Sequence, residues 1–274
     1  MYKVIVLAFK LTNVVRNIVT VSFLAIVLLL CSSNKLEFKK EYRVRTVVID
    51  AGHGGKDVGC NGKFSHEADV ALKLALQVGA LIEKNLPDVK VVYTRKDDNF
   101  VELADRAGIA NKNNADLFIS IHLNAGPSSA FGTETYTMGI QKSEGNLLVA
   151  KRENSVILQE DNYKENYGGF DPNSPQSHIL FALHQSAYID NSLRFADKVE
   201  SEFKHRVGRN SRGVKQAPFL VLWKSYMPSV LIECGFLTNP TEEKFLNDKT
   251  GQSYMASGIY RAFKAYKQEM EAMN

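Results

Sequence analysis

The sequence of 274 residues contains few cysteines, and this limits the class of protein. Cys31, Cys60 and Cys234 are its only cysteines, and Cys31 lies in an apolar segment near the N-terminus. The remaining two are too few for the disulfide framework of a small secreted scaffold. A single bridge between Cys60 and Cys234 is the alternative, but we expect two buried free thiols.

The sequence also lacks a strong charge imbalance and internal repeats. Its formal net charge is only +4, with 23% charged and 45% hydrophobic residues, as in an ordinary globular protein. A protein dedicated to nucleic acid usually carries a concentrated basic stripe, so we expect no nucleic-acid partner. The length allows one or two globular domains.

The N-terminal apolar run, residues 18–31, is shorter than the roughly 20 apolar residues that a transmembrane helix needs. Lys3, Lys10 and Arg16 precede it. A basic region followed by a short apolar region is the arrangement of an export signal. We therefore expect an exported protein in the periplasm or elsewhere in the cell envelope, with membrane contact only through this segment.

The end of this segment leaves its fate open. Small residues follow the run and could form a cleavage site near Ser33. The stretch "LLLC" resembles a bacterial lipoprotein box in which Cys31 is lipidated, although Leu30 stands where a small residue is usual. An uncleaved anchor is the third option. We expect residues 1–33 to be a signal peptide or a membrane or lipid anchor, and residues 34–42 to be a linker.

Residues 43–274 alternate between strand-like and helix-like segments. Short β-branched runs bounded by turn residues predict strands at 45–50, 89–94, 116–122, 132–138, 219–223 and 229–234. Apolar residues at helical spacing predict helices at 65–84, 100–114, 241–248 and 252–270. Ser65 is the expected N-cap of the first helix. This alternation implies an α/β fold, a single domain with a twisted, mostly parallel sheet of about six strands and helices on both faces.

The stretch "AGHGGKDVG", residues 51–59, follows the first predicted strand directly. Glycine loses more backbone entropy on folding than any other residue. Glycines at 52, 54 and 55 around His53 therefore indicate an unusual backbone shape or the close approach of a ligand. In parallel α/β sheets, ligands bind beyond the carboxyl ends of the strands, which is where His53 lies.

Three other ionisable residues belong to the same edge of the predicted sheet. His122 ends the third strand, Glu233 lies at the end of the last strand, and Glu67 lies in the first turn of the first helix. Two histidines, one carboxylate and a water form a catalytic zinc site. We therefore expect Zn²⁺ to be held by His53, Glu67 and His122. Glu233 is then free to take a proton from water and deliver it to a leaving amine.

These residues also have less specific interpretations. His66 could replace Glu67 as the ligand, and Glu233 could be a buried ion-pair partner of Arg95 or Arg106. The "HExxH" motif of zinc proteases is absent from the sequence. We assign no role to the histidines that look like surface or helix-face residues, His178, His184 and His205.

Six motifs resemble, in order, those of the zinc-dependent N-acetylmuramoyl-L-alanine amidases of the third type, which are bacterial cell-wall hydrolases. They are "VVIDAGHGGKDVG", "HEADVALKLA", "TRKDDNFVELADRAGIAN", "DLFISIHLNA", "GTETY" and "SVLIECGFLTNPTEEKFL". The resemblance covers about residues 45–267, implies a six-stranded sheet between helices and favours Glu67 over His66. It implies zinc ligands and a catalytic carboxylate at His53, Glu67, His122 and Glu233.

The resemblance further implies hydrolysis of the amide bond between N-acetylmuramic acid and L-alanine in peptidoglycan, during cell-wall remodelling or daughter-cell separation. One alternative is another exported zinc enzyme, a peptidase or a deacetylase. The other alternative is a non-catalytic wall-binding module with a structural zinc. Glu233 argues against the module, because a closed structural zinc site needs no additional carboxylate.

Residues 139–190 form a connection far longer than the few residues that a strand-to-helix link needs. Apolar residues at helical spacing occur on both sides of the stretch "YGGFDPNSP". In the resembled family, an insert here carries a helix that blocks the zinc until an activator protein moves it. An acidic side chain is required for such a block, and our candidates are Glu153 first and Glu165 second. A substrate-binding flap or a helical elaboration is the alternative.

Overall fold

The computed structural model describes residues 12–13, 15–26, 42–140, 143–182 and 188–273. The chain divides into two compact units, Met1–Glu41 and Tyr42–Asn274. Residues 15–26 of the first unit are helical and exposed. Among the described residues, no helix combines the length and the hydropathy that crossing a bilayer requires. The expected cleavage site, the lipidation of Cys31 and the linker up to residue 41 lie outside the described residues.

The second unit is built on a six-stranded sheet with the order β2-β1-β3-β6-β4-β5. Neighbouring strands are parallel except for β4 and β6, which are antiparallel. The predicted mostly parallel sheet is therefore confirmed. The strands are β1 (Thr46–Ala51), β2 (Lys90–Tyr93), β3 (Leu117–Asn124), β4 (Thr133–Met138), β5 (Ser211–Ala217) and β6 (Ser229–Phe236).

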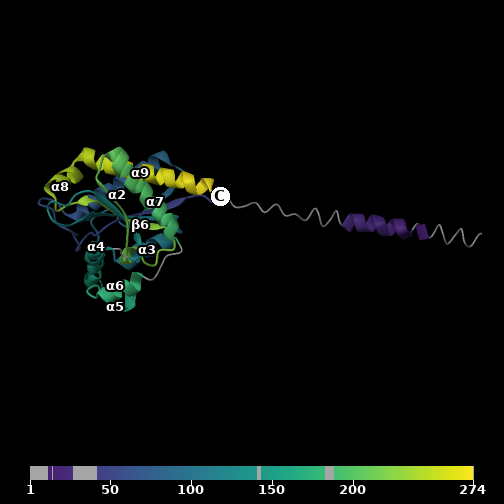
Figure 1. The fold of residues 1–274 in the computed structure, drawn as a ribbon, viewed down its shortest axis with the longest axis horizontal. Coiled ribbons are helices and arrows are strands. Elements are labelled where there is room, and N and C mark those ends of the chain that lie inside the picture. The colour runs from purple at the N-terminus through teal and green to yellow at the C-terminus, as the bar shows by residue number, and fades with distance from the viewer. Residues whose placement is uncertain (1–11, 14, 27–41, 141–142, 183–187, 274) are drawn as a thin grey trace, which may run out of the picture. The chain divides into compact units, whose positions relative to one another are not determined.

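Helices cover both faces of the sheet, as predicted (Figure 1). One face carries α2 (Glu67–Asn85), α7 (Ile189–Glu202) and α9 (Lys249–Ala272), with α8 (Pro240–Asn247) beside α9. The other face carries α3 (Leu103–Lys112) and helices from the described part of the insert, where the expected helical pattern forms α4 (Glu144–Asn154), η1 (Ser155–Gln159), α5 (Tyr163–Asn166) and α6 (Pro175–Ala182). The π-helix η2 (Phe203–Val207) follows α7.

Side chains alternate between the two faces of the sheet along each strand. One face is apolar, and the other becomes polar toward the carboxyl ends of the strands. Successive side chains of a strand point to opposite faces. In β1, Val47 and Ile49 join the core under α2 and α9, whereas Val48 joins the core under α3. Asp50 follows Val48 on the α3 face, and the same alternation in β3 leads from Phe118 to His122. The polar positions therefore gather at the carboxyl edge of the face that α3 and α4 cover.

The strand predicted at residues 219–223 is wrong. Residues Leu220–Leu222 form the short helix η3, and the fifth strand is β5, which precedes it. A short buried apolar run does not distinguish a strand from a helical turn. Strand β5 lies at the edge of the sheet and keeps most of its side chains partly exposed, so its sequence lacks the apolar pattern that would have revealed it.

The predicted N-cap of the first helix is also wrong. Helix α2 begins at Glu67, its N-cap is His66, and no side chain caps it. The hydroxyl of Ser65 instead donates a hydrogen bond to Glu243 Oε1 at 2.8 Å. The loop before α2 is therefore held by α8.

The two described cysteines are free thiols, as predicted. Cys234 is buried in β6, and Cys60 is partly buried beside the end of β3, where its thiol contacts the carbonyl oxygen of Leu123 at 3.3 Å. Burial raises the pKa of both thiols. Protonated thiols are poor nucleophiles, so we expect neither cysteine to act as a nucleophile.

Candidate active site

Strand register places three functional side chains side by side. His122 of β3 pairs with Glu233 of β6, and Glu233 in turn pairs with Glu134 of β4. Residues directly opposite one another on neighbouring strands project from the same face of the sheet. All three are buried, with Glu233 completely so. The row His122, Glu233, Glu134 therefore forms the floor of a polar site under α4.

The loop after β1 brings His53 to His122 through a strained backbone. His53 has a φ of 60°, in the left-handed region that side chains other than glycine rarely adopt. A Cβ atom on Gly52 would lie 2.5 Å from the His122 ring, and one on Gly54 would lie 2.4 Å from the carbonyl oxygen of Asn99. The glycines thus permit the close approach of the two histidines, through the unusual backbone shape that the sequence indicated.

Two buried arginines hold this loop by its carbonyl groups. Arg95 donates to the carbonyl oxygens of Ala51 and Gly52, and Arg106 donates to that of His53 at 2.9 Å. Arg106 also forms an ion pair with Asp50 at 2.9 Å. Neither arginine pairs with Glu233, so the ion pairs considered for Glu233 from the sequence do not form.

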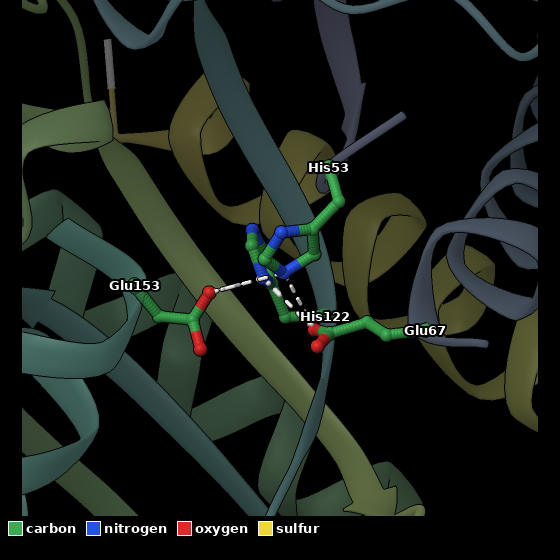
Figure 2. A group of neighbouring side chains, drawn as sticks. All are labelled: His53, Glu67, His122 and Glu153. Atoms are coloured by element: carbon green, nitrogen blue, oxygen red, sulfur yellow. Dashed lines mark hydrogen bonds and ion pairs between the residues drawn. The ribbon is translucent and has the colours of Figure 1, made fainter. Parts of the chain in front are cut away.

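Four buried side chains converge on one point: His53, Glu67, His122 and Glu153 (Figure 2). Glu67 Oε1 lies 3.1 Å from His53 Nε2 and 3.1 Å from His122 Nδ1. Glu153 Oε2 lies 3.2 Å and 3.0 Å from the same two nitrogen atoms. Imidazole nitrogens and carboxylate oxygens at this spacing, from a loop, two helices and a strand, form a group that can hold a metal ion.

The group contains buried polar atoms that the described protein does not satisfy. His53 Nε2 and Glu153 Oε2 are buried and lie 3.2 Å apart, but neither has a partner among the described residues that meets hydrogen-bond geometry. Such an atom costs free energy unless a partner satisfies it. A metal ion at the centre of the group would satisfy both atoms, so the donor set fits a metal site.

The carboxylates change the protonation of the histidines in the metal-free chain. Burial disfavours the imidazolium of His53, but Glu67, Asp57 and Glu153 outweigh this effect and raise the pKa of His53 well above its usual value. Burial likewise opposes the charge on His122, yet Glu153 and Glu67 raise its pKa to about 9. Because a metal ligand must be unprotonated, a metal ion has to displace these protons when it binds.

Neighbouring groups fix the orientation of the ligands. Asp57 Oδ2 lies 2.7 Å from His53 Nδ1, which turns the other ring nitrogen toward the metal group. Glu67 accepts backbone N–H bonds from Cys60 at 2.8 Å and from Leu123 at 2.9 Å. His66 instead pairs with Asn61 at 2.7 Å and is not part of the group. Of the two residues considered from the sequence, Glu67 is therefore the one in the group.

Glu233 lies beside the group and is paired with Arg152 of α4. Arg152 Nη2 is 3.3 Å from Glu233 Oε1 and 2.7 Å from Glu153 Oε1. Burial, the largest cause, raises the pKa of Glu233 well above its usual value, with further increases from Glu153 and Glu67, although Arg152 lowers it. Arg152 had no role in the sequence interpretation, because only the position of α4 brings it to Glu233.

The remaining candidates lie elsewhere. Glu165 is exposed in α5 and is not in the metal group. His178 is buried in α6 rather than exposed, with its Nε2 2.9 Å from the carbonyl oxygen of Pro172. His205 is exposed in η2, and His184 lies outside the described residues. Neither His178 nor His205 belongs to the metal group.

Comparison with known proteins identifies relatives along most of the chain. The family model described as N-acetylmuramoyl-L-alanine amidase (Amidase_3) matches residues 47–265. AmiC from Escherichia coli strain CFT073 is 34% identical over 224 residues, which cover 80% of this chain and 52% of AmiC. AmiA from Escherichia coli K12 is 32% identical over 239 residues, which cover 85% of this chain and 80% of AmiA. The chain thus spans about half of AmiC and most of AmiA.

Solved structures with the same fold agree with these sequence matches. The N-acetylmuramoyl-L-alanine amidase from Clostridium difficile 630 has a TM-score of 0.61 and 31% identity, over 82% of this chain and 97% of that one. The CwlD amidase from Clostridioides difficile, in complex with the GerS lipoprotein, has a TM-score of 0.60 and 27% identity over 82% of this chain and 99% of that one. The resemblance found in the sequence motifs is confirmed. The chain belongs to the Amidase_3 family of N-acetylmuramoyl-L-alanine amidases.

Proposed function

We propose that the chain hydrolyses the amide bond between the lactyl group of N-acetylmuramic acid and L-alanine in peptidoglycan, with one Zn²⁺ held by His53, Glu67 and His122. The observation that carries this proposal is the buried group of facing imidazole and carboxylate atoms directly beside Glu233. Catalytic zinc sites commonly combine two histidines with one carboxylate and keep a fourth position for water or substrate.

The types of donor atom support zinc as the metal, and four of the distances between them are close to those of a tetrahedral site. Four ligands at zinc distances in a tetrahedron lie about 3.3 Å from one another. The distances from the two histidine nitrogens to the two carboxylate oxygens are 3.0–3.2 Å. The two imidazoles suit a borderline metal ion such as Zn²⁺ better than Mg²⁺ or Ca²⁺, which prefer oxygen ligands.

Zn²⁺ in this site supplies Lewis-acid polarisation of the amide carbonyl and a lowered pKa of water. Glu233 then acts as the proton carrier. It accepts a proton from the attacking water and donates it to the nitrogen of L-alanine as the C–N bond breaks. The buried Glu233 Oε2 has no hydrogen-bond partner among the described residues, so it is available for this proton. A carboxyl group with a raised pKa suits both halves of the transfer.

Dependence on the metal tests this proposal. We expect chelator-treated, metal-free protein to lose hydrolysis of a muramoyl peptide and to regain it when one equivalent of Zn²⁺ is added. The zinc-loaded Glu233→Gln variant is the control, because metal alone should not restore its activity. Full activity in metal-free protein would rule out the zinc mechanism. A peptidase or a deacetylase would share this metal dependence, so the bond that is cleaved has to be identified separately.

We propose further that Glu153 is a removable fourth ligand that keeps the enzyme inactive. Its Oε2 occupies the corner of the donor group that a catalytic site leaves for water or substrate. Arg152 and the two histidines lower the pKa of Glu153 well below its usual value despite burial, which favours the ionised form. Because both residues belong to α4, displacement of this helix would free the metal and Glu233 together.

Replacement of Glu153 with alanine tests the block. If the blocked state holds about 90–99% of the molecules, removal of the carboxylate raises hydrolysis about 10- to 100-fold without a partner protein. Glu165→Ala is the matched control, since it removes an exposed glutamate from the same insert. Initial rates of zinc-loaded variants measure the effect. A Glu153→Ala variant that binds zinc but is no faster than the parent would show that Glu153 does not block the site.

The point substitution is a sharper test than deletion of the insert. Val156, Ile157 and Tyr167 belong to the apolar core beneath α3. Glu160 accepts hydrogen bonds from Leu103 N and from Tyr167 Oη. Deletion of residues 153–169 would remove these contacts and the blocking carboxylate together, and a loss of folding could hide a gain in activity.

The proposal also includes export from the cytoplasm and a protein that activates the enzyme. As a member of a cell-wall amidase family, the chain acts outside the cytoplasm. We propose that residues 1–33 direct export and that an activator protein binds the insert 139–190 and displaces α4. The CwlD amidase has been solved in complex with the GerS lipoprotein, so a relative of this fold does associate with another protein.

A further inference from the structure

A groove lies on the side of Glu233 opposite the metal group. In the sheet, β6 separates β3, which carries His122, from β4 and β5. The groove has a volume of about 380 Å³ and is walled on one side by α4. Arg152 lines the groove and also contacts Glu233 at 3.3 Å, so this arginine connects the groove with the carboxylate that we propose as catalytic. Its sheet side is lined by Asn124, Glu134, Tyr136, Arg212, Lys215 and Phe236.

Glu134 anchors the cationic side chains of this groove. Its carboxylate is 2% exposed. It accepts hydrogen bonds from Tyr136 Oη at 2.5 Å and Asn124 Nδ2 at 3.2 Å, and it pairs with Lys215 Nζ at 2.7 Å and with Arg212 Nε. Two cations therefore share one carboxylate. Apart from Arg152, which is paired with Glu153 and Glu233, the groove retains an excess of positive charge.

Arg212 can accept a second anion without giving up Glu134. Its side chain is 40% exposed, and its guanidinium lies over the Phe236 ring at 5.1 Å from the ring centroid. A guanidinium has five N–H donors, and the Nε–H bond to Glu134 uses one of them. The remaining planar fork matches a carboxylate. Lys215, whose side chain is 21% exposed, adds a second positive charge from the same strand.

We propose that this groove binds the carboxylate of the glutamyl residue that follows L-alanine in the peptide of the substrate. This inference rests on the proposed function, because it needs the scissile amide at Glu233. Neighbouring strands lie about 4.8 Å apart, and the Arg212 and Lys215 side chains reach Glu134 on the strand next to β6. One extended peptide residue spans about 3.5 Å. An anion in the groove is therefore one or two residues from the cleaved bond.

Binding of two muramoyl dipeptides tests the groove. They differ only in the second residue, whose γ-carboxyl group is blocked as a methylamide in both and whose α-carboxyl group is free in the glutamate form and a carboxamide in the isoglutamine form. The protein is the zinc-loaded Arg152→Gln, Glu153→Ala, Glu233→Gln triple variant, which should bind substrate without cleaving it and holds no unpaired Arg152 in the groove. Calorimetry should show roughly tenfold tighter binding of the glutamate form, the scale of one hydrogen-bonded charge pair. Arg212→Gln in this background should remove the preference, whereas Arg206→Gln, a change at an exposed arginine outside the groove, should preserve it.

The two dipeptides distinguish loss of the carboxylate subsite from a general disturbance of the structure. A structural disturbance weakens binding of both dipeptides equally, whereas loss of a carboxylate subsite weakens only the glutamate form. Equal affinities in the triple variant, a preference that survives Arg212→Gln, or no binding of either dipeptide would overturn the proposal. Hydrolysis by Glu153→Ala at equal rates for both dipeptides would reject the groove but keep the amidase function. A preference for the glutamate form in binding, without hydrolysis of either dipeptide by Glu153→Ala, would keep the groove but reject the amidase function.

Discussion

Replacement of Glu233 with glutamine is expected to lower hydrolysis of a muramoyl peptide by at least about 100-fold, the usual scale of general acid–base catalysis. Glutamine keeps the shape of the side chain but cannot carry the proton from water to the amine. Glu233 is outside the donor group, so the variant should retain stoichiometric zinc. Steady-state rates and zinc content of the purified variant measure the two effects.

The matched control for this change is Glu200→Gln. Glu200 is also a buried glutamate, but it lies on α7 and accepts hydrogen bonds from Thr133, Thr135 and Ser211 on the opposite face of the sheet. This control should therefore keep its activity. Near-normal turnover by Glu233→Gln, with zinc content unchanged, would exclude Glu233 as the proton carrier.

Loss of any of the three ligands is expected to abolish both zinc binding and hydrolysis. We expect this of His53→Ala, Glu67→Ala and His122→Ala separately, because each leaves an incomplete donor set. Replacement of an outer partner of a metal ligand already costs about 10–100-fold in metal affinity or activity, and loss of the ligand itself should cost more. Metal analysis after dialysis and initial rates provide the measurement.

The ligand variants should remain folded. The apolar cores on both faces of the sheet involve none of the three ligands, so circular dichroism should be close to that of the parent. His66→Ala is the control, since it removes a histidine next to Glu67 that pairs with Asn61. Stoichiometric zinc in a ligand variant would remove that residue from the set, and zinc loss in His66→Ala would question the choice of Glu67.

The sequence was informative where side-chain position follows from strand geometry. His122 and Glu233 lie near the carboxyl ends of neighbouring parallel strands, and the apolar runs before them predicted that they meet at one edge. The glycines around His53 indicated a close approach, which the 2.5 Å separation between a Gly52 Cβ and the His122 ring explains. In both cases a local sequence pattern determines the backbone conformation, and that conformation determines where the side chains of the site lie.

The sequence was less informative where packing between distant segments decides the outcome. Residues 219–223 are as apolar as a strand, but they form η3, and the polar edge strand β5 has no comparable pattern. Glu153 was predicted to block the metal only through the resemblance to the amidase family. Helical spacing in the sequence predicts that α4 forms but not which part of the sheet it covers. The contact of Arg152 with Glu233 and the anchoring of two cations by Glu134 depend on the same tertiary packing.

The identity of the cleaved bond tests the central claim most directly. Zinc-loaded parent and Glu153→Ala protein would each be incubated with a muramoyl dipeptide, and the products identified by mass spectrometry. We predict two products, N-acetylmuramic acid and a dipeptide with a free L-alanine amino group, whose masses sum to that of the substrate plus one water. Release of acetate, cleavage between the two amino acids, or intact substrate with both proteins would contradict the assignment as an N-acetylmuramoyl-L-alanine amidase.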